Sequence, residues 1–154
     1  MRTLTLVRRI KARPSIVFEA LTTPEGIAGW WGPDAGPVLF AKTDVRVGGC
    51  FRVRFRMLDG SEHESAGEYL EVEKPKRLVM SWQWTAGGEP YEAGNLSRLA
   101  FELEPIDSGT ELTLTHTQLK TEASRISHEQ GWAGAIDKLV QRFSYASADH
   151  HEQT

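Results

Sequence analysis

Apolar and polar residues alternate along most of the chain, and this period of two predicts a protein built mainly of β-strands. Near the N-terminus Leu4, Leu6 and Ile10 share one face, which Arg8 interrupts. From Val38 onward the alternation recurs in segments that turn-forming residues separate. The predicted strands lie near residues 4–11, 38–46, 50–58, 63–73, 77–85, 96–104 and 110–118.

Turn chemistry between these segments predicts antiparallel pairing. Asp59-Gly60 is a strong two-residue hairpin signal, and Gly48-Gly49 provides a permissive turn. Lys74-Pro75-Lys76 breaks the next pair, and Asp107-Ser108-Gly109 closes the last one. Because short turns join neighbouring strands in opposite directions, the segments predict an antiparallel meander.

The predicted sheet has one apolar face and one polar face, as expected where one side packs on a core and the other meets water. The apolar side carries Phe51, Val53, Phe55 and Met57, and the polar side carries Arg52, Arg54 and Arg56. The same alternation continues in residues 78–84, 99–103 and 112–116. The sheet therefore has one broad apolar face, which another element of the chain must bury.

Helical signals flank the strands. Pro14 begins a short helix that ends at Thr22-Thr23-Pro24, and a second short turn runs from Glu25 to Gly29. A long helix is predicted from Thr121 or Ser124 to Tyr145, with a polar tail at residues 147–154. Its apolar stripe, which would cover the sheet, consists of Trp132, Ile136, Leu139 and Phe143.

Two glycines interrupt this long helix. Gly131 and Gly134 each lower helix propensity by about 1 kcal/mol against Ala. Their presence indicates either a close backbone approach or space left open. The order of strand, two short helices, antiparallel run and long helix predicts the helix-grip fold. This is an α+β fold in which a curved antiparallel sheet of about seven strands wraps the last helix, as one domain over residues 1–146.

Composition narrows the classes of function. The chain has 154 residues, enough for one domain, and 18 Lys and Arg against 21 Asp and Glu give a net charge of -3. No basic surface for nucleic acid and no apolar run long enough to span a membrane is expected. Cys50 is the only cysteine and the start lacks a signal peptide, so a reducing cytoplasm is expected.

Five tryptophans in so short a chain are the first functional hint. A candidate cavity between sheet and long helix would be lined by Trp30, Trp31, Phe55, Met57, Trp82, Trp84, Trp132 and Ile136. For Trp82 and Trp132 a purely structural core role is the simpler interpretation. For the adjacent Trp30 and Trp31 we expect one indole to fold inward and the other to guard an entrance.

His116 and Glu68 are the polar candidates for this cavity. His116 continues the inward alternation of Leu112 and Leu114, and Glu68 shares a face with Leu70. A satisfied imidazole and an exposed carboxylate are the simpler interpretations, so neither is predicted to be catalytic. No metal or cofactor is predicted, because His128-Glu129 lacks the second histidine of a zinc helix and no phosphate loop is present.

Several segments together carry a resemblance. They are Ile10–Pro14, Val17–Thr22, Trp30–Pro33, Gly48–Phe51, Asp59-Gly60, Gly67–Val72, Arg77–Trp82, Thr113–His116 and Gly131–Leu139. In this order the chain resembles the family named after the activator of the heat-shock-protein-90 ATPase, within the START-like (SRPBCC) superfamily. The resemblance covers almost the whole chain and implies the helix-grip fold.

Fold does not fix function, because this scaffold hosts carriers, cyclases and co-chaperones. The leading hypothesis is a cytoplasmic protein that binds a hydrophobic or aromatic small molecule between sheet and helix. One alternative is a protein-interaction module resembling the chaperone activator, using the outer face with Arg52, Arg54 and Arg56. A second is an enzyme like an aromatic-polyketide cyclase, which the scarcity of inward polar residues disfavours.

Overall fold

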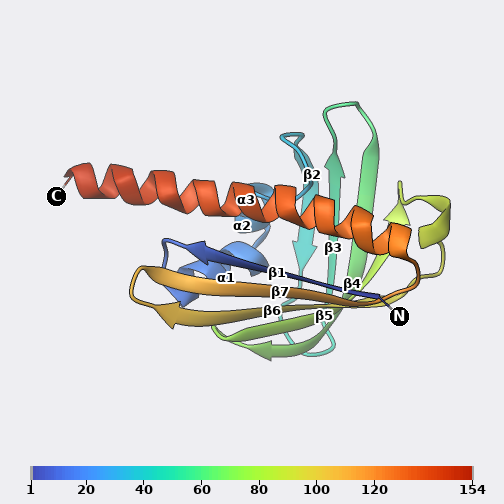
Figure 1. The fold of residues 1–154 in the computed structure, drawn as a ribbon, viewed down its shortest axis with the longest axis horizontal. Helices are drawn as coiled ribbons and strands as arrows, with labels where there is room; N and C mark the ends of the chain where they lie inside the picture. Colours follow the sequence, from blue (N-terminus) through green and yellow to red (C-terminus); the bar gives the residue numbers. More distant parts are fainter. Residues whose placement is uncertain (1, 154) are drawn as a thin grey trace.

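A curved antiparallel sheet and one long helix form the body of the protein (Figure 1). The computed structural model describes residues 2–153, except for the side chains of Tyr91 and of residues 145–153. The elements in chain order are β1 (Arg2–Ile10), α1 (Pro14–Thr22), α2 (Pro24–Ala28), β2 (Val38–Thr43), β3 (Cys50–Arg56), β4 (Glu62–Glu73), β5 (Arg77–Ala86), the 3₁₀ turn η1 (Pro90–Glu92), β6 (Ser97–Ile106), β7 (Gly109–Leu119) and α3 (Glu122–Gln153).

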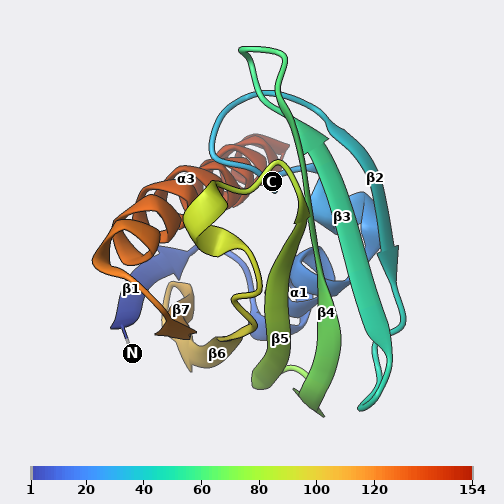
Figure 2. The same ribbon diagram turned by 90° about the vertical axis from the view of Figure 1, so that its right-hand side faces the viewer.

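The seven strands lie in the order β1-β7-β6-β5-β4-β3-β2, and every neighbouring pair is antiparallel. Figure 2 shows the sheet bending around an interior that α3 covers on one side, with α1 behind this interior in the view. The meander places consecutive strands from β2 to β7 side by side, and β1 joins the edge at β7. This arrangement confirms the helix-grip fold.

Strand alternation places the predicted apolar residues inside. Leu78, Met80 and Trp82 on β5 are buried, as are Leu99 and Phe101 on β6. At the turn before β4, Gly60 has a φ of +88°, which a residue without Cβ adopts at little cost. The Asp59-Gly60 hairpin is therefore confirmed.

The first half of β4 alternates regularly, with its odd-numbered residues inward. His63, Ser65 and Gly67 pair with the buried residues of β3, and Tyr69 follows them into the core. Glu68 is therefore exposed and Leu70 only partly buried, so the expectation that Leu70 marks the inward face of this strand is wrong. A register shift between Tyr69 and Glu71 then reverses the alternation, and Val72 packs against the core.

α3 begins where the sequence indicates and ends later. The Thr121 hydroxyl accepts a hydrogen bond from the Ser124 N–H at 3.0 Å, which caps the first turn. The helix continues to Gln153, past the predicted end at Tyr145. No proline or glycine follows Gly134, so nothing in the sequence stops the helix. Its last turns project beyond the sheet (Figure 1).

The two glycines of α3 serve different purposes. A Cβ added at Gly134 would lie 2.3 Å from the Pro33 carbonyl oxygen, so the loop after α2 lies directly against the helix backbone there. A Cβ added at Gly131 would meet nothing closer than the Pro33 Cβ at 4.0 Å. Gly134 therefore permits a close approach, and Gly131 leaves space open.

This difference predicts opposite effects of one substitution. Gly134→Ala should lower the free energy of unfolding by about 1–3 kcal/mol, because the methyl group overlaps a carbonyl oxygen. Gly131→Ala should raise it by up to about 1 kcal/mol through helix propensity. Urea unfolding of both variants measures this, and a shift of the same sign in both would contradict the assignment.

Candidate functional site

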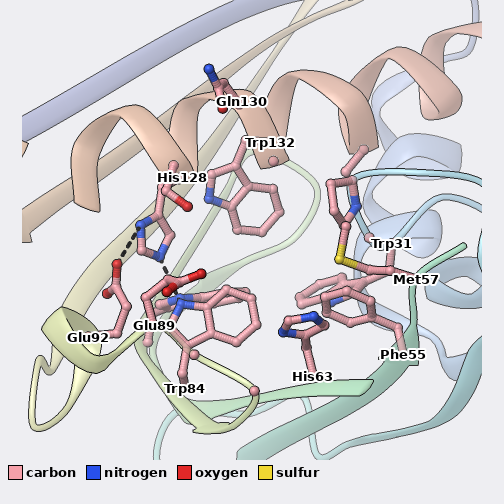
Figure 3. Close-up of a pocket in the computed structure, with 18 residues that line it drawn as sticks. Trp31, Phe55, Met57, His63, Trp84, Glu89, Glu92, His128, Gln130 and Trp132 are labelled. Carbon is pink, nitrogen blue, oxygen red and sulfur yellow. Dashed lines mark hydrogen bonds and ion pairs between the residues drawn. The ribbon is translucent and has the colours of Figure 1, made fainter. Parts of the chain in front are cut away.

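A cavity of about 340 Å³ lies between the sheet and α3. Side chains from β3, β4 and β5, the loop after α2, the loop after β5 and α3 line it (Figure 3). Six of the sequence-predicted residues line it, namely Trp31, Phe55, Met57, Trp82, Trp84 and Trp132. The cavity thus lies where the alternation of β3 and β5 faces the first half of α3.

The other four predicted residues do not line this cavity. Trp30 is buried against α1, where its indole N–H donates to the Ala20 carbonyl at 2.8 Å. Ile136 is fully buried in the core, and Glu68 is exposed on β4. His116 is fully buried behind the cavity wall.

Trp30 and Trp31 both fold inward, with exposed fractions of 1% and 5%. The expectation that one of them guards an entrance is therefore wrong. The reason lies in α3: Lys138 Nζ donates to the backbone carbonyls of Trp31 and Asp34, which holds this loop against the helix. As a result, the Trp31 side chain lines the cavity, and Trp30 packs between Trp31 and α1.

Indole rings form most of the inner wall. The rings of Trp31 and Trp82 stack with centroids 5.6 Å apart and an interplanar angle of 30°. Trp132 lies 5.1 Å from Trp82 and 5.7 Å from Trp31, almost perpendicular to the latter at 78°. Trp132 is only 5% exposed, so it is part of the core and of the cavity wall at once.

His116 connects α3 to the sheet behind this wall. Trp132 Nε1–H donates to His116 Nδ1 at 3.1 Å, and His116 Nε2 lies 2.7 Å from Ser97 Oγ. Because an indole N–H only donates, Nδ1 must accept and the imidazole proton lies on Nε2. Ser97 Oγ in turn donates to the Trp82 carbonyl at 3.2 Å. Both imidazole nitrogens are occupied, so His116 is a structural link rather than a base.

His128 makes a second link, which the sequence analysis missed. Trp84 Nε1–H donates to its Nε2 at 3.1 Å, and its Nδ1 donates to the Ser124 carbonyl at 2.8 Å. The His128 ring also lies across His116, with centroids 4.7 Å apart. The available signal was helical spacing, because residue 128 is four positions before Trp132 and shares its face.

The pKa values of both histidines are lowered, and the cause in each case is chiefly burial. For His116 the repulsion from His128 adds to the effect. Protonation of His116 would also place two donors, Nδ1–H and the Trp132 N–H, against each other. Both imidazoles are therefore neutral in the folded protein at neutral pH.

The loop after β5 closes one end of the cavity with carboxylates. Glu89 and Glu92 line this end, and Figure 3 shows Glu92 beside His128. Asn95 fixes the loop, since its Nδ2 donates to the Gln118 carbonyl at 3.0 Å and its Oδ1 accepts from the Lys120 N–H at 3.1 Å. The sequence shows an acidic stretch here, which argues against phosphate binding, but it does not indicate that Glu89 and Glu92 reach the cavity.

The site combines an aromatic cavity wall with polar groups that hydrogen bonds hold in place. Its wall is aromatic, and the two histidines next to it are held in hydrogen bonds. No group of three or more His, Cys, Asp or Glu side chains suited to a metal ion occurs within the described residues. Nor does any helix of the described residues have the length and apolar character to cross a membrane.

A curved antiparallel sheet gripping a long C-terminal helix defines the START-like class of proteins. Within this class, residues 11–144 match the family "Activator of Hsp90 ATPase homolog 1-like protein". The match covers most of the chain, and the protein belongs to this family.

Solved structures share this fold. A protein from Nitrosomonas europaea is 28% identical with a TM-score of 0.76, covering 95% of this chain and 96% of its own. An AHSA1 protein from Silicibacter pomeroyi has a TM-score of 0.80 at 23% identity, covering 94% and 99%. An AHSA1-like protein from Aeromonas hydrophila has a TM-score of 0.72 at 20% identity, covering 96% and 94%. A comparison with curated proteins gave no match.

The buried histidines predict a loss of stability in mild acid. A histidine whose folded pKa is lowered binds a proton more readily when unfolded, so stability is full above the unfolded pKa of about 6.5 and falls as the pH drops below it. Each such imidazole contributes up to about 1.4 kcal/mol per pH unit. Urea unfolding of wild type and of His116→Gln between about pH 5.5 and 7.5 should show a shallower slope in the variant.

His128→Gln removes the other buried imidazole and provides a second variant for this experiment. It should also show a shallower slope than wild type, because burial lowers the pKa of His128 as well. Equal slopes in wild type and His116→Gln would show that the imidazole link does not oppose protonation.

Proposed function

We propose that this protein binds a hydrophobic or aromatic small molecule in the cavity between the sheet and α3. The observation that carries the proposal is the lining: four indoles, Trp31, Trp82, Trp84 and Trp132, meet around one space of about 340 Å³. Ligand sites in proteins are concave, mostly apolar and about 300–1,000 Å³ in volume. The volume suits a molecule of one or two fused rings.

The rigidity of the wall supports the same proposal. Trp84 and Trp132 are each fixed by a hydrogen bond to a buried histidine, at 3.1 Å in both cases. Side chains held in this way lose little further freedom when a ligand binds, which reduces the entropic cost of binding. Gly131 adds to this support, because a larger residue there would extend into the same space.

The outer face of the sheet gives less support to the alternative function, a protein-interaction module that resembles the chaperone activator. Arg52 pairs with Glu64 at 2.8 Å, and Arg54 pairs with Glu62 at 3.0 Å. Arg56 also pairs with Glu62, at 3.2 Å. The arginine row is thus largely neutralised by the neighbouring strand and does not form a basic surface for an acidic partner. We favour the cavity over a chaperone-docking role, with the protein acting as a cytoplasmic carrier rather than an enzyme.

A neutral fluorescent probe tests the proposal. N-phenyl-naphthylamine should bind saturably and change the tryptophan emission, because filling the cavity removes water from the indoles. Gly131→Leu should weaken this binding at least about tenfold, since its side chain occupies the cavity. Gln141→Leu, at an exposed position of the same helix, is the matched control and should bind like wild type.

Two results would refute the proposal. Absence of saturable binding to the folded wild type would mean that the cavity does not take up ligands. Unchanged affinity in Gly131→Leu, with unfolding curves showing a folded variant, would place the probe elsewhere on the protein.

A further inference from the structure

Charge is distributed unevenly around the cavity. Glu89 and Glu92 lie at the end formed by the loop after β5, whereas Trp31, Phe55 and Met57 lie toward the opposite end (Figure 3). Among the described residues that line the cavity there is no Lys or Arg. The cavity therefore combines an acidic end with an apolar, aromatic end.

Glu92 is the more informative of the two carboxylates. Its side chain is only 6% exposed, and Oε1 is buried without a hydrogen-bond partner in the described structure. The nearest cationic candidate is His128, whose Nδ1 lies 3.7 Å from Oε1, too far for a hydrogen bond, and donates to the Ser124 carbonyl instead. Leaving a buried carboxylate oxygen unpaired is costly unless a partner arrives.

The histidine beside Glu92 does not supply the missing charge. Burial lowers the pKa of His128, and its Nε2 accepts the Trp84 N–H, so the ring stays neutral. The facing imidazole of His116 is neutral as well. A positive charge that meets Glu92 must therefore come from the ligand.

The aromatic wall suits the same kind of group. Indole faces carry the negative part of the ring quadrupole and attract cations within about 6 Å of the ring centroid. Trp84 stands next to His128, with centroids 5.9 Å apart, and so lies beside the acidic end. An ammonium group at that end would meet carboxylates and an indole together, while an anionic ligand would be repelled.

We propose that the ligand is a protonated amine with an aromatic or other apolar body, whose ammonium group lies at Glu89 and Glu92 and whose body lies among the tryptophans. This inference rests on the proposed function and adds the chemical class of the ligand to it. Glu92 would accept a hydrogen bond from the ammonium, and the desolvated cation would be shared with the indole face.

Three naphthalene probes of similar shape and different charge test the inference. Naphthylmethylamine is cationic, naphthylmethanol is neutral and naphthoate is anionic at neutral pH. Each is titrated directly by calorimetry and also in competition with the neutral reporter N-phenyl-naphthylamine. We expect the amine to bind about tenfold more tightly than the alcohol, and the anion to bind more weakly than both.

Variants of the acidic residues show which carboxylate causes the preference for the amine over the alcohol. Glu92→Gln keeps the shape of the side chain and should reduce the preference for the amine about tenfold, leaving the alcohol unchanged. Glu89→Gln should have a smaller effect, because Glu89 is exposed. Glu104→Gln removes an exposed carboxylate on β6 that does not line the cavity, so it controls for net charge.

The outcomes separate this inference from the proposed function. Equal binding of amine and alcohol, or a preference that survives in Glu92→Gln, would show that the inference is wrong while reporter binding still supports a ligand cavity. A preference lost equally in Glu104→Gln would also contradict it, because net charge alone would be the cause. Failure of reporter, amine and alcohol to bind would overturn both proposals.

Discussion

The hydrogen bond from the Trp132 indole to His116 joins α3 to β7 and fixes the height of the helix above the sheet. Every element of the cavity depends on that spacing. The Trp132 ring and the His116 imidazole lie between α3 and β7. They keep the backbone of α3 from packing directly against the apolar face of the sheet. Ser97 extends the link to β6 and, through its hydroxyl, to the Trp82 carbonyl. A chain of buried hydrogen bonds whose members are all satisfied is rigid and specifies one arrangement.

The same link explains why the cavity lies beside the first half of α3. Behind it, Ile136 and Leu139 pack directly into the core and leave no room. On the cavity side of the link, α3 carries Gly131 and the sheet carries Trp84. The loop after β5 completes the cavity wall there. The cavity is thus a consequence of where large and small residues fall along one helix face, combined with a loop that Asn95 ties to the start of α3.

Most of the fold could be predicted from the sequence, because alternation and turn residues are local signals. The strands around Phe51, Leu78 and Leu112 follow from period two alone. The register shift after Tyr69 could not be predicted, since it depends on pairing with β5. The tryptophan wall was predicted from composition and alternation, but Glu92 and His128 were not, because a loop closes onto a helix only in three dimensions. The inward position of Trp30 likewise depends on a carbonyl of α1 that no local pattern indicates.

The residues around this cavity include several that lower the stability of the fold and that a purely structural core would not need. Gly131 weakens a helix without permitting any close contact. Of the three buried side-chain atoms without a partner in the described structure, Trp82 Nε1 and Glu92 Oε1 belong to cavity residues. If stability were the only constraint, we would expect a larger residue at position 131 and a neutral residue at position 92. Proteins carry destabilising residues mainly at functional sites. Trp82, Glu92 and Gly131 all line one cavity, so these departures gather at the site proposed for the ligand.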